Sequence, residues 1–525
     1  MNEAPASVDI FLVSHTNVGK TTLIRTLLGK DVGEVFDAPD VTKALTSHDL
    51  VVDPALGSLR LWDTPGFGDS FKLSKRLKQS SWVAGALREL WDRPFDSALW
   101  RGQRLALELK QRASVIIYPV NLLERPVDAV YVAPELEILA WVGQPVLVLL
   151  NQGGALGPAE EAERIAQWQE HLAGFPVVQR VLSLDAYTRC WLQELVLFKE
   201  IGHLLPEPEQ GAYARLAAVL AQSYAERFDR SGVAIAHYLL RLSRDQVTLE
   251  TGWFEGLKDL IHSLRAQVPW GRPADMTPVE LGMQGLAQRY AEQTKALTDK
   301  LIALHRLDGV SAAEVLKGAG ERLAIDKPLD ASSAVTGGVV SGILTGLSAD
   351  LMTGGLTLGT GALIGGVMGG FGAAALAKGY NVLAHKDKKL VRWSTASLNE
   401  AMARTAMLYL SMAHFGRGQG QWRRKEEPKA WAAAVNEALA RHHDALNAVW
   451  ASAQAGTAAD AAAPPRHAAL EAVIKQVLQA SLLRLYPEAA ACLPAVVEPR
   501  LASVAEPAQL ERSPVKDEGA SQGLP

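Results

Sequence analysis

The sequence predicts an α/β fold for residues 1–205, with a mostly parallel sheet, followed by a mainly α-helical part. The first observation is three short, almost wholly apolar runs, 8–13, 114–121 and 146–151, with helical sequence between them. Such runs are typical of strands buried on both faces of a parallel sheet. The second is that strand patterns almost vanish after Gly211, where alanine, leucine, glutamate and arginine recur at helical spacing. The third is a glycine-rich apolar block inside that helical part.

Composition and charge fit a multidomain globular protein. The chain has 525 residues, of which 48% are hydrophobic and 21% charged, enough for sizeable cores. The net charge of −4 gives no general nucleic-acid footprint. Cys190 and Cys492 lie far apart without metal-ligand spacing, which favours a reducing compartment over a disulfide scaffold or zinc site. Residues 1–5 show no secretion signal, so we expect the chain to stay inside the cell.

A phosphate-binding loop is predicted at 14–21, between the first apolar run and an apolar helix. Backbone N–H groups of such a loop wrap the β-phosphate, and the helix N-terminus adds partial positive charge. Lys20 would reach the β- and γ-phosphates, and Thr21 would ligate Mg²⁺. The usual first glycine is replaced by a serine. The expected nucleotide-binding residues here are Ser14, His15, Thr16, Asn17, Val18, Gly19, Lys20, Thr21 and Thr22.

Two downstream segments complete the predicted phosphate site. Thr42 lies in a polar segment where a threonine can sense the γ-phosphate and Mg²⁺, with Thr46 as the alternative. A strand then ends at Asp63, before a Thr-Pro-Gly turn. Asp63 would hold Mg²⁺ through a water, and the N–H of Gly66 would meet the γ-phosphate. We therefore expect Lys20, Thr42 and Gly66 to carry the catalysis.

The P-loop together with Asp63-Thr64-Pro65-Gly66 resembles the translation-factor-related GTPases, specifically the Era-like group. The resemblance implies GTP and GDP as ligands and Mg²⁺ as the metal. Phe67 stands where Ras-type enzymes have a glutamine that orients the attacking water, so we expect slow intrinsic turnover. Asn17 matches an asparagine that binds K⁺ in some Era-like relatives; the alternative is that it only braces the loop.

The expected base-binding end departs from the family pattern. The run 146–151 ends in Asn151-Gln152-Gly153-Gly154, where the family has Asn-Lys-x-Asp. Asn151 is kept and Gln152 can stack over the ring, but Gly154 has no carboxylate to read guanine. Ser183 stands at the family's Ser-Ala-Lys loop, where the rest matches poorly. From the resemblance we expect GTP as the ligand. ATP is the alternative, because the guanine-reading carboxylate is missing.

An insertion of two helices packed on the GTPase domain is predicted at 70–112. Pro94 interrupts any continuous helix, and the spacing of Trp82, Trp91 and Trp100 excludes one aromatic stripe. Later helices are predicted at 213–242, 246–268, 278–307, 390–414 and 470–486, with another ending near 452. The predicted division is a GTPase domain at 1–205, helical domains at 206–330 and 379–498, a glycine-rich hairpin at 331–378, and a disordered tail at 499–525.

The glycine-rich hairpin is the predicted membrane contact. Glycine recurs at every fourth residue, which suits close helix–helix packing. Two segments, 334–352 and 356–377, are each about long enough to span a bilayer, and Asp350 is the one charge between 331 and 377. Basic residues follow the second segment, so both ends would face the cytoplasm, at the inner membrane. The alternative is a glycine-packed hairpin inside a soluble domain.

The whole layout resembles a bacterial GTPase family whose C-terminal domain has no assigned function. Our hypothesis is a GTPase switch coupled to a membrane-associated helical domain, with a membrane lipid or membrane protein as partner. Self-association through the GTPase domain is a further expected contact. One alternative is a nucleotide-binding membrane scaffold that does not hydrolyse its ligand. The other is an ATPase, because the guanine-reading carboxylate is missing.

Overall fold

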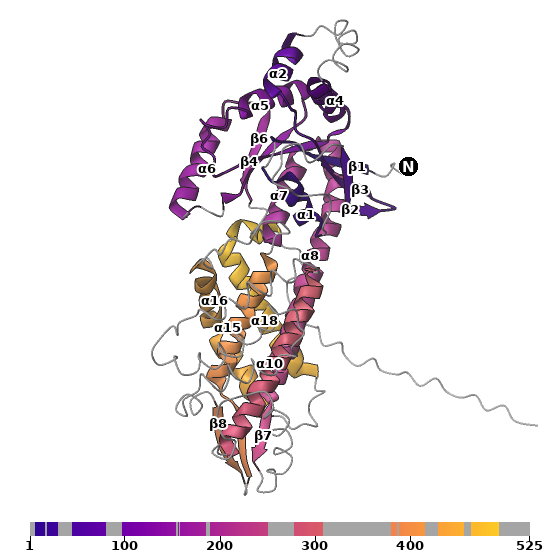
Figure 1. Cartoon of the computed structure of the whole chain (residues 1–525). Coiled ribbons are helices and arrows are strands. Elements are labelled where there is room, and N and C mark those ends of the chain that lie inside the picture. Colours follow the sequence, from indigo (N-terminus) through magenta and orange to yellow (C-terminus); the bar gives the residue numbers. More distant parts are fainter. Residues whose placement is uncertain are drawn as a thin grey trace, which may run out of the picture.

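The computed structural model places an α/β region at one end of the molecule and an elongated helical region at the other (Figure 1). It describes residues 6–15, 18–29, 45–79, 97–153, 156, 158–184, 190–249, 278–307, 380–385, 388–414, 429–455 and 464–492. The main sheet has six strands in the order β2-β3-β1-β4-β5-β6. Every neighbouring pair is parallel except β2–β3. The predicted fold class, a mostly parallel sheet followed by a helical region, is confirmed.

Helices cover both faces of this sheet, and the alternation of side chains along β1 shows why. Ile10 and Leu12 join one core with α1, α7 and α8, whereas Phe11 and Val13 join the core under α2, α4, α5 and α6. The strands are β1 (Ala6–Leu12), β2 (Thr46–Asp53), β3 (Gly57–Asp63), β4 (Val115–Asn121), β5 (Val146–Asn151) and β6 (Val178–Ser183). The helices are α1 (Lys20–Leu28), α2 (Ser70–Gln79), α4 (Ser97–Arg112), α5 (Val132–Val142), α6 (Pro158–Leu172) and α7 (Trp191–Leu204).

The predicted insertion contributes α2 and α4, which pack against each other and against α5. Gly102 allows α4 to lie close to the loop after β3, because a Cβ there would be 2.7 Å from the carbonyl oxygen of Phe67. Residues 80–96, with Trp82, Trp91 and Pro94, lie outside the described residues. The insertion therefore packs directly against the loop that follows Asp63.

The long helix α8 (Glu207–Arg244) connects the two regions (Figure 1). Its first turn accepts Pro208, since a proline there removes no hydrogen bond. Its buried residues belong to the same core as one face of the sheet, so the two regions share one hydrophobic core. Further helices are α10 (Pro278–Leu304), α15 (Thr395–Ala413), α16 (Lys429–Arg441), α17 (His443–Ala455) and α18 (Pro464–Leu485), followed by a 3-10 helix (Pro487–Cys492).

A second, three-stranded sheet corrects the helices predicted to begin at 246 and 390. It consists of β7 (Gln246–Leu249), β8 (Tyr380–His385) and β9 (Lys388–Trp393), in the antiparallel order β7-β9-β8. Val391 and Trp393 are buried while the residues between and before them are half-exposed, which is the period of a strand. The strands are short and adjoin longer helical sequence, so their two-residue alternation was read as part of the neighbouring helices.

Several predicted segments lie outside the described residues. These are the glycine-rich hairpin at 331–378, the tail at 499–525, and 251–277, which holds most of the helix predicted over 246–268. In the part of the chain that the structure describes, no helix is long and apolar enough to cross a bilayer. Membrane contact through 331–378 therefore stays a prediction.

Candidate nucleotide-binding site

The P-loop lies at the carboxyl edge of the main sheet, between the end of β1 and the start of α1. Ligands of open parallel sheets bind at this edge. Gly19 caps α1 with a φ of 89°, in the left-handed region that favours glycine. A Cβ at this position would also lie 2.8 Å from Nδ2 of Asn151. Glycine is thus required at residue 19 by backbone conformation and by space.

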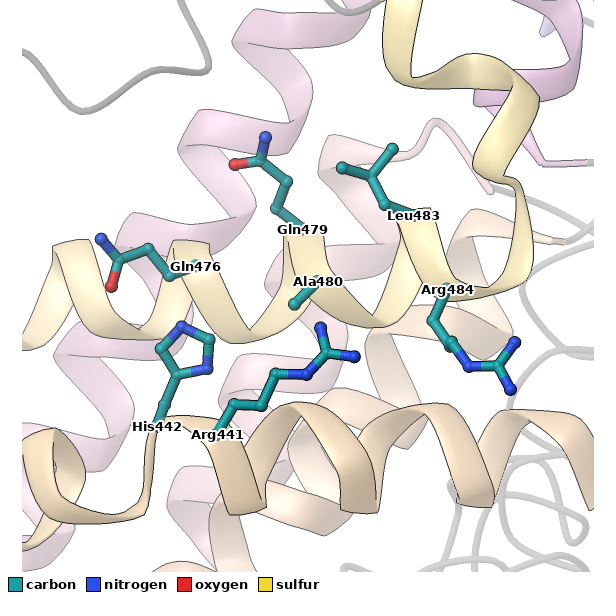
Figure 2. Close-up of a pocket in the computed structure, with 7 residues that line it drawn as sticks. All are labelled: Arg441, His442, Gln476, Gln479, Ala480, Leu483 and Arg484. Carbon is teal, nitrogen blue, oxygen red and sulfur yellow. The ribbon is translucent and has the colours of Figure 1, made fainter.

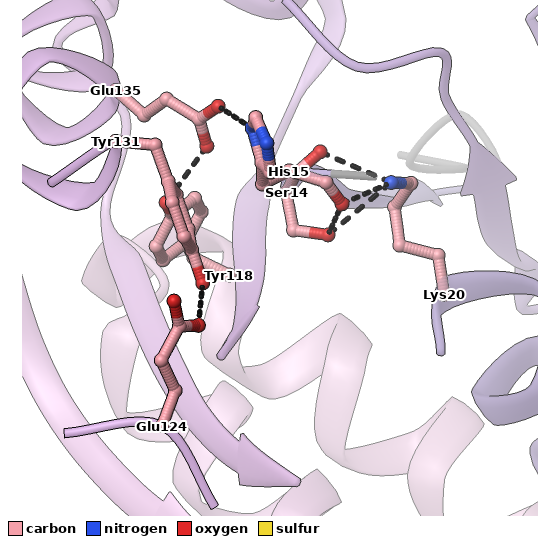
Figure 3. A network of polar contacts seen from close by, with 7 residues as sticks. All are labelled: Ser14, His15, Lys20, Tyr118, Glu124, Tyr131 and Glu135. Atoms are coloured by element: carbon pink, nitrogen blue, oxygen red, sulfur yellow. Dashed lines mark hydrogen bonds and ion pairs between the residues drawn. The ribbon is translucent and has the colours of Figure 1, made fainter. Parts of the chain in front are cut away.

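The ammonium group of Lys20 is held inside the P-loop (Figure 3). Its Nζ donates to the backbone oxygens of Ser14 and His15, each at 3.0 Å, and to Oγ of Ser14 at 3.3 Å. The Ser14 hydroxyl also donates to the His15 oxygen at 3.1 Å. Ser14, which replaces the usual glycine, therefore adds a side-chain acceptor that helps to fix the cation where phosphate oxygens would arrive.

Thr21 and Asp63, the two described candidates for the magnesium site, lie in contact. The Thr21 hydroxyl donates to Oδ2 of Asp63 at 3.0 Å. The other oxygen, Oδ1, is buried and accepts no hydrogen bond from any residue that the structure describes. Burial raises the pKa of Asp63, although Thr21 and the charge of Lys20 act against that rise. A buried carboxylate with an unused oxygen beside a hydroxyl fits Mg²⁺ or one of its waters.

This arrangement suits a metal that takes most of its ligands from phosphate and water. Among the described residues, no group of three or more His, Cys, Asp or Glu side chains could hold a metal ion. Mg²⁺ is usually bound by one or two protein groups together with substrate phosphates. Thr42, the predicted third contact, lies outside the described residues. The alternative, Thr46, lies opposite Asp63 in the β2–β3 register, at the same edge of the sheet.

The loop after Asp63 is fixed by its neighbours and turns Phe67 away from the phosphate edge. Thr64 donates its hydroxyl to the backbone oxygen of Leu12 at 2.7 Å, which ties the loop to β1. Gly66 follows, half-buried. The side chain of Phe67 is 1% exposed and belongs to the core that contains Leu73 of α2. Phe67 therefore anchors this loop in the core, and its ring offers the site no proton acceptor.

At the expected base end, Asn151 contacts the P-loop. Its buried Nδ2 donates to the backbone oxygen of Val18 at 2.8 Å. Gln152 has a φ of 64°, and its Nε2 lies 3.5 Å from the position of a Cβ on Gly19. Ser183 is exposed at the end of β6, beside Leu150 of β5. Gly154, where the guanine-reading carboxylate is missing, lies outside the described residues.

Most predicted site residues thus lie near one edge of the sheet. They are Ser14, His15, Val18, Gly19, Lys20, Thr21, Thr22, Asp63, Gly66, Asn151, Gln152 and Ser183. Thr22 is buried in the first turn of α1. Thr16, Asn17 and Thr42 lie outside the described residues, so their predicted roles, including K⁺ binding by Asn17, stay predictions.

A polar cluster beside the P-loop was missed by the sequence reasoning (Figure 3). Nδ1 of His15 lies 3.2 Å from Oε1 of Glu135, and Tyr118 donates its hydroxyl to Oε2 of Glu135 at 2.7 Å. The ring of Tyr131 stacks on the His15 ring, with centroids 4.2 Å apart, and the Tyr131 hydroxyl donates to Oε2 of Glu124 at 2.8 Å. Burial, with the Glu135 charge, raises the pKa of the Tyr118 hydroxyl. The available signal was an acid, Glu135, in the first turn of the largely apolar helix α5.

Two cavities lie away from the phosphate edge. One, of about 240 Å³, lies at the far end of α1, where Gly29 and Asp49 meet Arg227 and Arg306 of the helical region. The other is an open groove of about 520 Å³ along α18 (Figure 2). Its cations, Arg441 and Arg484, both pair with Glu437. The two arginines of the groove thus share one carboxylate, and its lining residues include no acid–base pair.

The class of protein follows from the sheet, the P-loop and the Thr21–Asp63 pair, and sequence families agree with it. Residues 9–152 match the family described as 50S ribosome-binding GTPase. Residues 290–479 match a domain of unknown function, DUF3482. The protein is a P-loop GTPase-domain protein. The pairing of a P-loop GTPase domain with a C-terminal domain of unknown function is the one that the sequence predicted.

Solved structures with local similarity include two of Era. A point variant of Aquifex aeolicus Era bound to GDP and tetrafluoroaluminate is 21% identical, over 38% of this chain and 57% of that one, with a TM-score of 0.29. Era in complex with MgGDPNP and a segment of 16S ribosomal RNA is 22% identical, over 39% of this chain and 58% of that one, with a TM-score of 0.28. A probable GTP-binding protein, engB, is 16% identical, over 34% of this chain and 88% of that one, with a TM-score of 0.22. The chain spans a little over half of both Era chains, and no curated protein matches it.

Proposed function

We propose that the protein is a switch that hydrolyses GTP to GDP and phosphate and is coupled to its C-terminal helical domain. The observation that carries this proposal is the position of Lys20, whose ammonium is held 3.0 Å from two P-loop carbonyl oxygens. Beside it, Thr21 and Asp63 form a pair suited to Mg²⁺. A fixed cation and a metal site at a helix N-terminus are what a nucleoside triphosphate requires.

In the proposed reaction a water attacks the γ-phosphate. Lys20 and the N–H of Gly66 stabilise the charge that develops on the phosphate oxygens. Thr21, Thr42 and, through a water, Asp63 would hold Mg²⁺, which neutralises the same charge when it is bound. Because Phe67 is buried in the core, its ring cannot orient the water. Slow intrinsic turnover follows, raised by K⁺ at Asn17 or by a partner; equal turnover in Na⁺ and K⁺ would remove the K⁺ part.

The coupling to the helical domain rests on the core that the sheet shares with α8. The proposal places the protein on the cytoplasmic side of the inner membrane, in contact with it through 331–378. Fractionation of cells that express the full chain, or a chain without 331–378, tests this part. Loss of the membrane pool on deletion supports it, and equal distribution of both chains contradicts it.

Competition between GTP and ATP for the purified protein tests the nucleotide. GTP should displace a fluorescent GDP at a far lower concentration than ATP does, and a single-turnover assay should show release of phosphate. Lys20→Ala should weaken nucleotide binding roughly hundredfold, because it removes charged contacts to two phosphates. Preference for ATP would favour the ATPase alternative, and binding without turnover would favour the scaffold. Normal turnover by Lys20→Ala would refute the site.

A further inference from the structure

His15 belongs to two sets of contacts at once. Its backbone oxygen accepts a hydrogen bond from the Lys20 ammonium at 3.0 Å. Its side chain lies with Nδ1 3.2 Å from Oε1 of Glu135, on α5. One residue therefore joins the phosphate-binding lysine to a carboxylate that lies 120 residues away in the sequence.

Glu135 is completely buried, and both of its oxygens have partners. Oε1 faces His15, and Oε2 accepts the Tyr118 hydroxyl at 2.7 Å. A carboxylate in a core costs stability unless its hydrogen bonds are satisfied, and an apolar residue of similar volume would avoid that cost. Beyond an acceptor for the buried Tyr118 hydroxyl, the packing of α5 thus gives no reason for an acid at residue 135. What the acid adds is a fixed attachment for the His15 ring.

The ring is held from a second direction. Tyr131 stacks on it at 4.2 Å with an interplanar angle of 17°, and the Tyr131 hydroxyl is itself held by Glu124 at 2.8 Å (Figure 3). Glu135 therefore fixes one edge of the imidazole and Tyr131 fixes one face. A side chain restrained at edge and face limits the backbone dihedrals of its own residue, and so the direction of its carbonyl oxygen.

We propose that Glu135 is a positioning residue for Lys20, acting through His15. The inference rests on the proposed function, because the cation it positions is the one that meets the phosphates. Glu135 itself touches no nucleotide. Its loss should weaken the binding of nucleotide phosphates by letting the His15 carbonyl, and with it the Lys20 ammonium, leave the productive position.

The test compares Glu135→Leu, His15→Ala and the double variant in the full chain. Each single variant should weaken GTP and GDP binding roughly tenfold. The double variant should be no weaker than the worse single one, because both break the same connection. His15→Gln keeps a side-chain N–H donor towards Glu135 and should recover most of the loss. If Glu135→Leu fails to fold, Glu135→Gln keeps the shape and an acceptor for Tyr118, and should show a loss of about threefold.

Glu194→Leu is the matched control. Glu194 of α7 is also buried and also accepts a tyrosine hydroxyl, from Tyr224, but lies away from the P-loop at the far end of α1. This variant removes the carboxylate that accepts the buried Tyr224 hydroxyl, so it should melt at a lower temperature. It should still bind GTP within twofold of the wild type. Equal weakening by Glu194→Leu and Glu135→Leu would overturn the positioning role, as would additive losses in the double variant. A wild type that binds no GTP would instead refute the proposed function.

Discussion

The two ends of helix α1 are built alike but lie against different neighbours. Gly19 precedes the helix with a φ of 89°, and Gly29 follows it with a φ of 62°. Near each end a buried glutamate accepts a tyrosine hydroxyl: Glu135 from Tyr118 near the start, and Glu194 from Tyr224 near the finish. The first pair contacts the P-loop through His15, whereas the second lines the 240 Å³ cavity shared with the helical region.

On our proposal, a buried acid–phenol pair gains a functional role from the group that its second carboxylate oxygen contacts. Near the start of α1 that oxygen faces His15, a residue whose backbone holds the Lys20 ammonium. At the finish, the neighbours include Arg227 of α8 and Arg306, just after α10, so the pair contributes to the junction between the regions. Substitutions matched across the two ends should therefore separate nucleotide binding from stability.

The largest expected difference lies between Gly19→Ala and Gly29→Ala. Both place a methyl group on left-handed backbone, but within the described part of the chain only the one at residue 19 would meet an atom, Nδ2 of Asn151 at 2.8 Å. Gly19→Ala must shift the P-loop and should weaken GDP binding by at least roughly hundredfold. Gly29→Ala should cost about 1 kcal/mol of unfolding free energy and leave binding unchanged. Fluorescent GDP titration and urea unfolding measure the two effects.

A wild-type affinity in Gly19→Ala would show that the loop accommodates a side chain where the structure has no room for one. Weak binding by Gly29→Ala would show that the far end of α1 acts on the phosphate site. Either result would remove the distinction between the two ends.

A smaller difference is expected between Tyr118→Phe and Tyr224→Phe. Each removes the hydroxyl that a buried glutamate accepts, so each should lower the free energy of unfolding by about 1–3 kcal/mol. Tyr118→Phe should also weaken GDP binding several-fold, since Glu135 then holds His15 without its second support. Tyr224→Phe should bind GDP as the wild type does. Loss of affinity in both variants, in proportion to their loss of stability, would contradict separate roles.

The parts of this molecule that could be predicted from sequence are those whose partners are close along the chain. The P-loop pattern needs only a strand, a loop and a helix in succession, so spacing alone predicts Lys20 and Thr21 as site residues. Asp63 is predicted because a strand end and a turn adjoin it. Its contact with Thr21 then follows from β1 and β3 lying side by side in parallel.

The missed features all depend on distant partners. Glu135 meets His15 across 120 residues, and no local period marks that contact. Gln246 of β7 pairs with Arg392 of β9, so residues 246–249 form a strand instead of the expected helix. The local sequence pattern does not contain this distant pairing. Phe67 was recognised as an unusual residue, but its burial under α2 and α4 depends on an insertion whose packing the sequence did not specify.

The smallest expected effect concerns charge at the two ends of α1. Burial raises the pKa of Asp63 above its ordinary value of 3.8, so the folded, metal-free protein binds that proton more tightly than the unfolded chain. Stability therefore falls as the pH rises from 3.8 through the raised pKa, and the whole cost is present above that pKa. Asp63→Asn removes the cost and should stabilise the nucleotide-free protein at pH 7 by about 1 kcal/mol.

Asp49→Asn, at the exposed acid near the other end of α1, is the control and should change stability by less than about 0.5 kcal/mol. Urea unfolding in EDTA at pH 5 and pH 7 measures both variants, and the advantage of Asp63→Asn should be larger at pH 7. The same variant should lose the gain in GTP affinity that Mg²⁺ gives the wild type. A less stable Asp63→Asn would mean that the carboxylate stabilises the empty site. The buried Asp63 carboxylate near the start of α1 would then not destabilise the empty site, and a bound cation would have no such destabilisation to relieve.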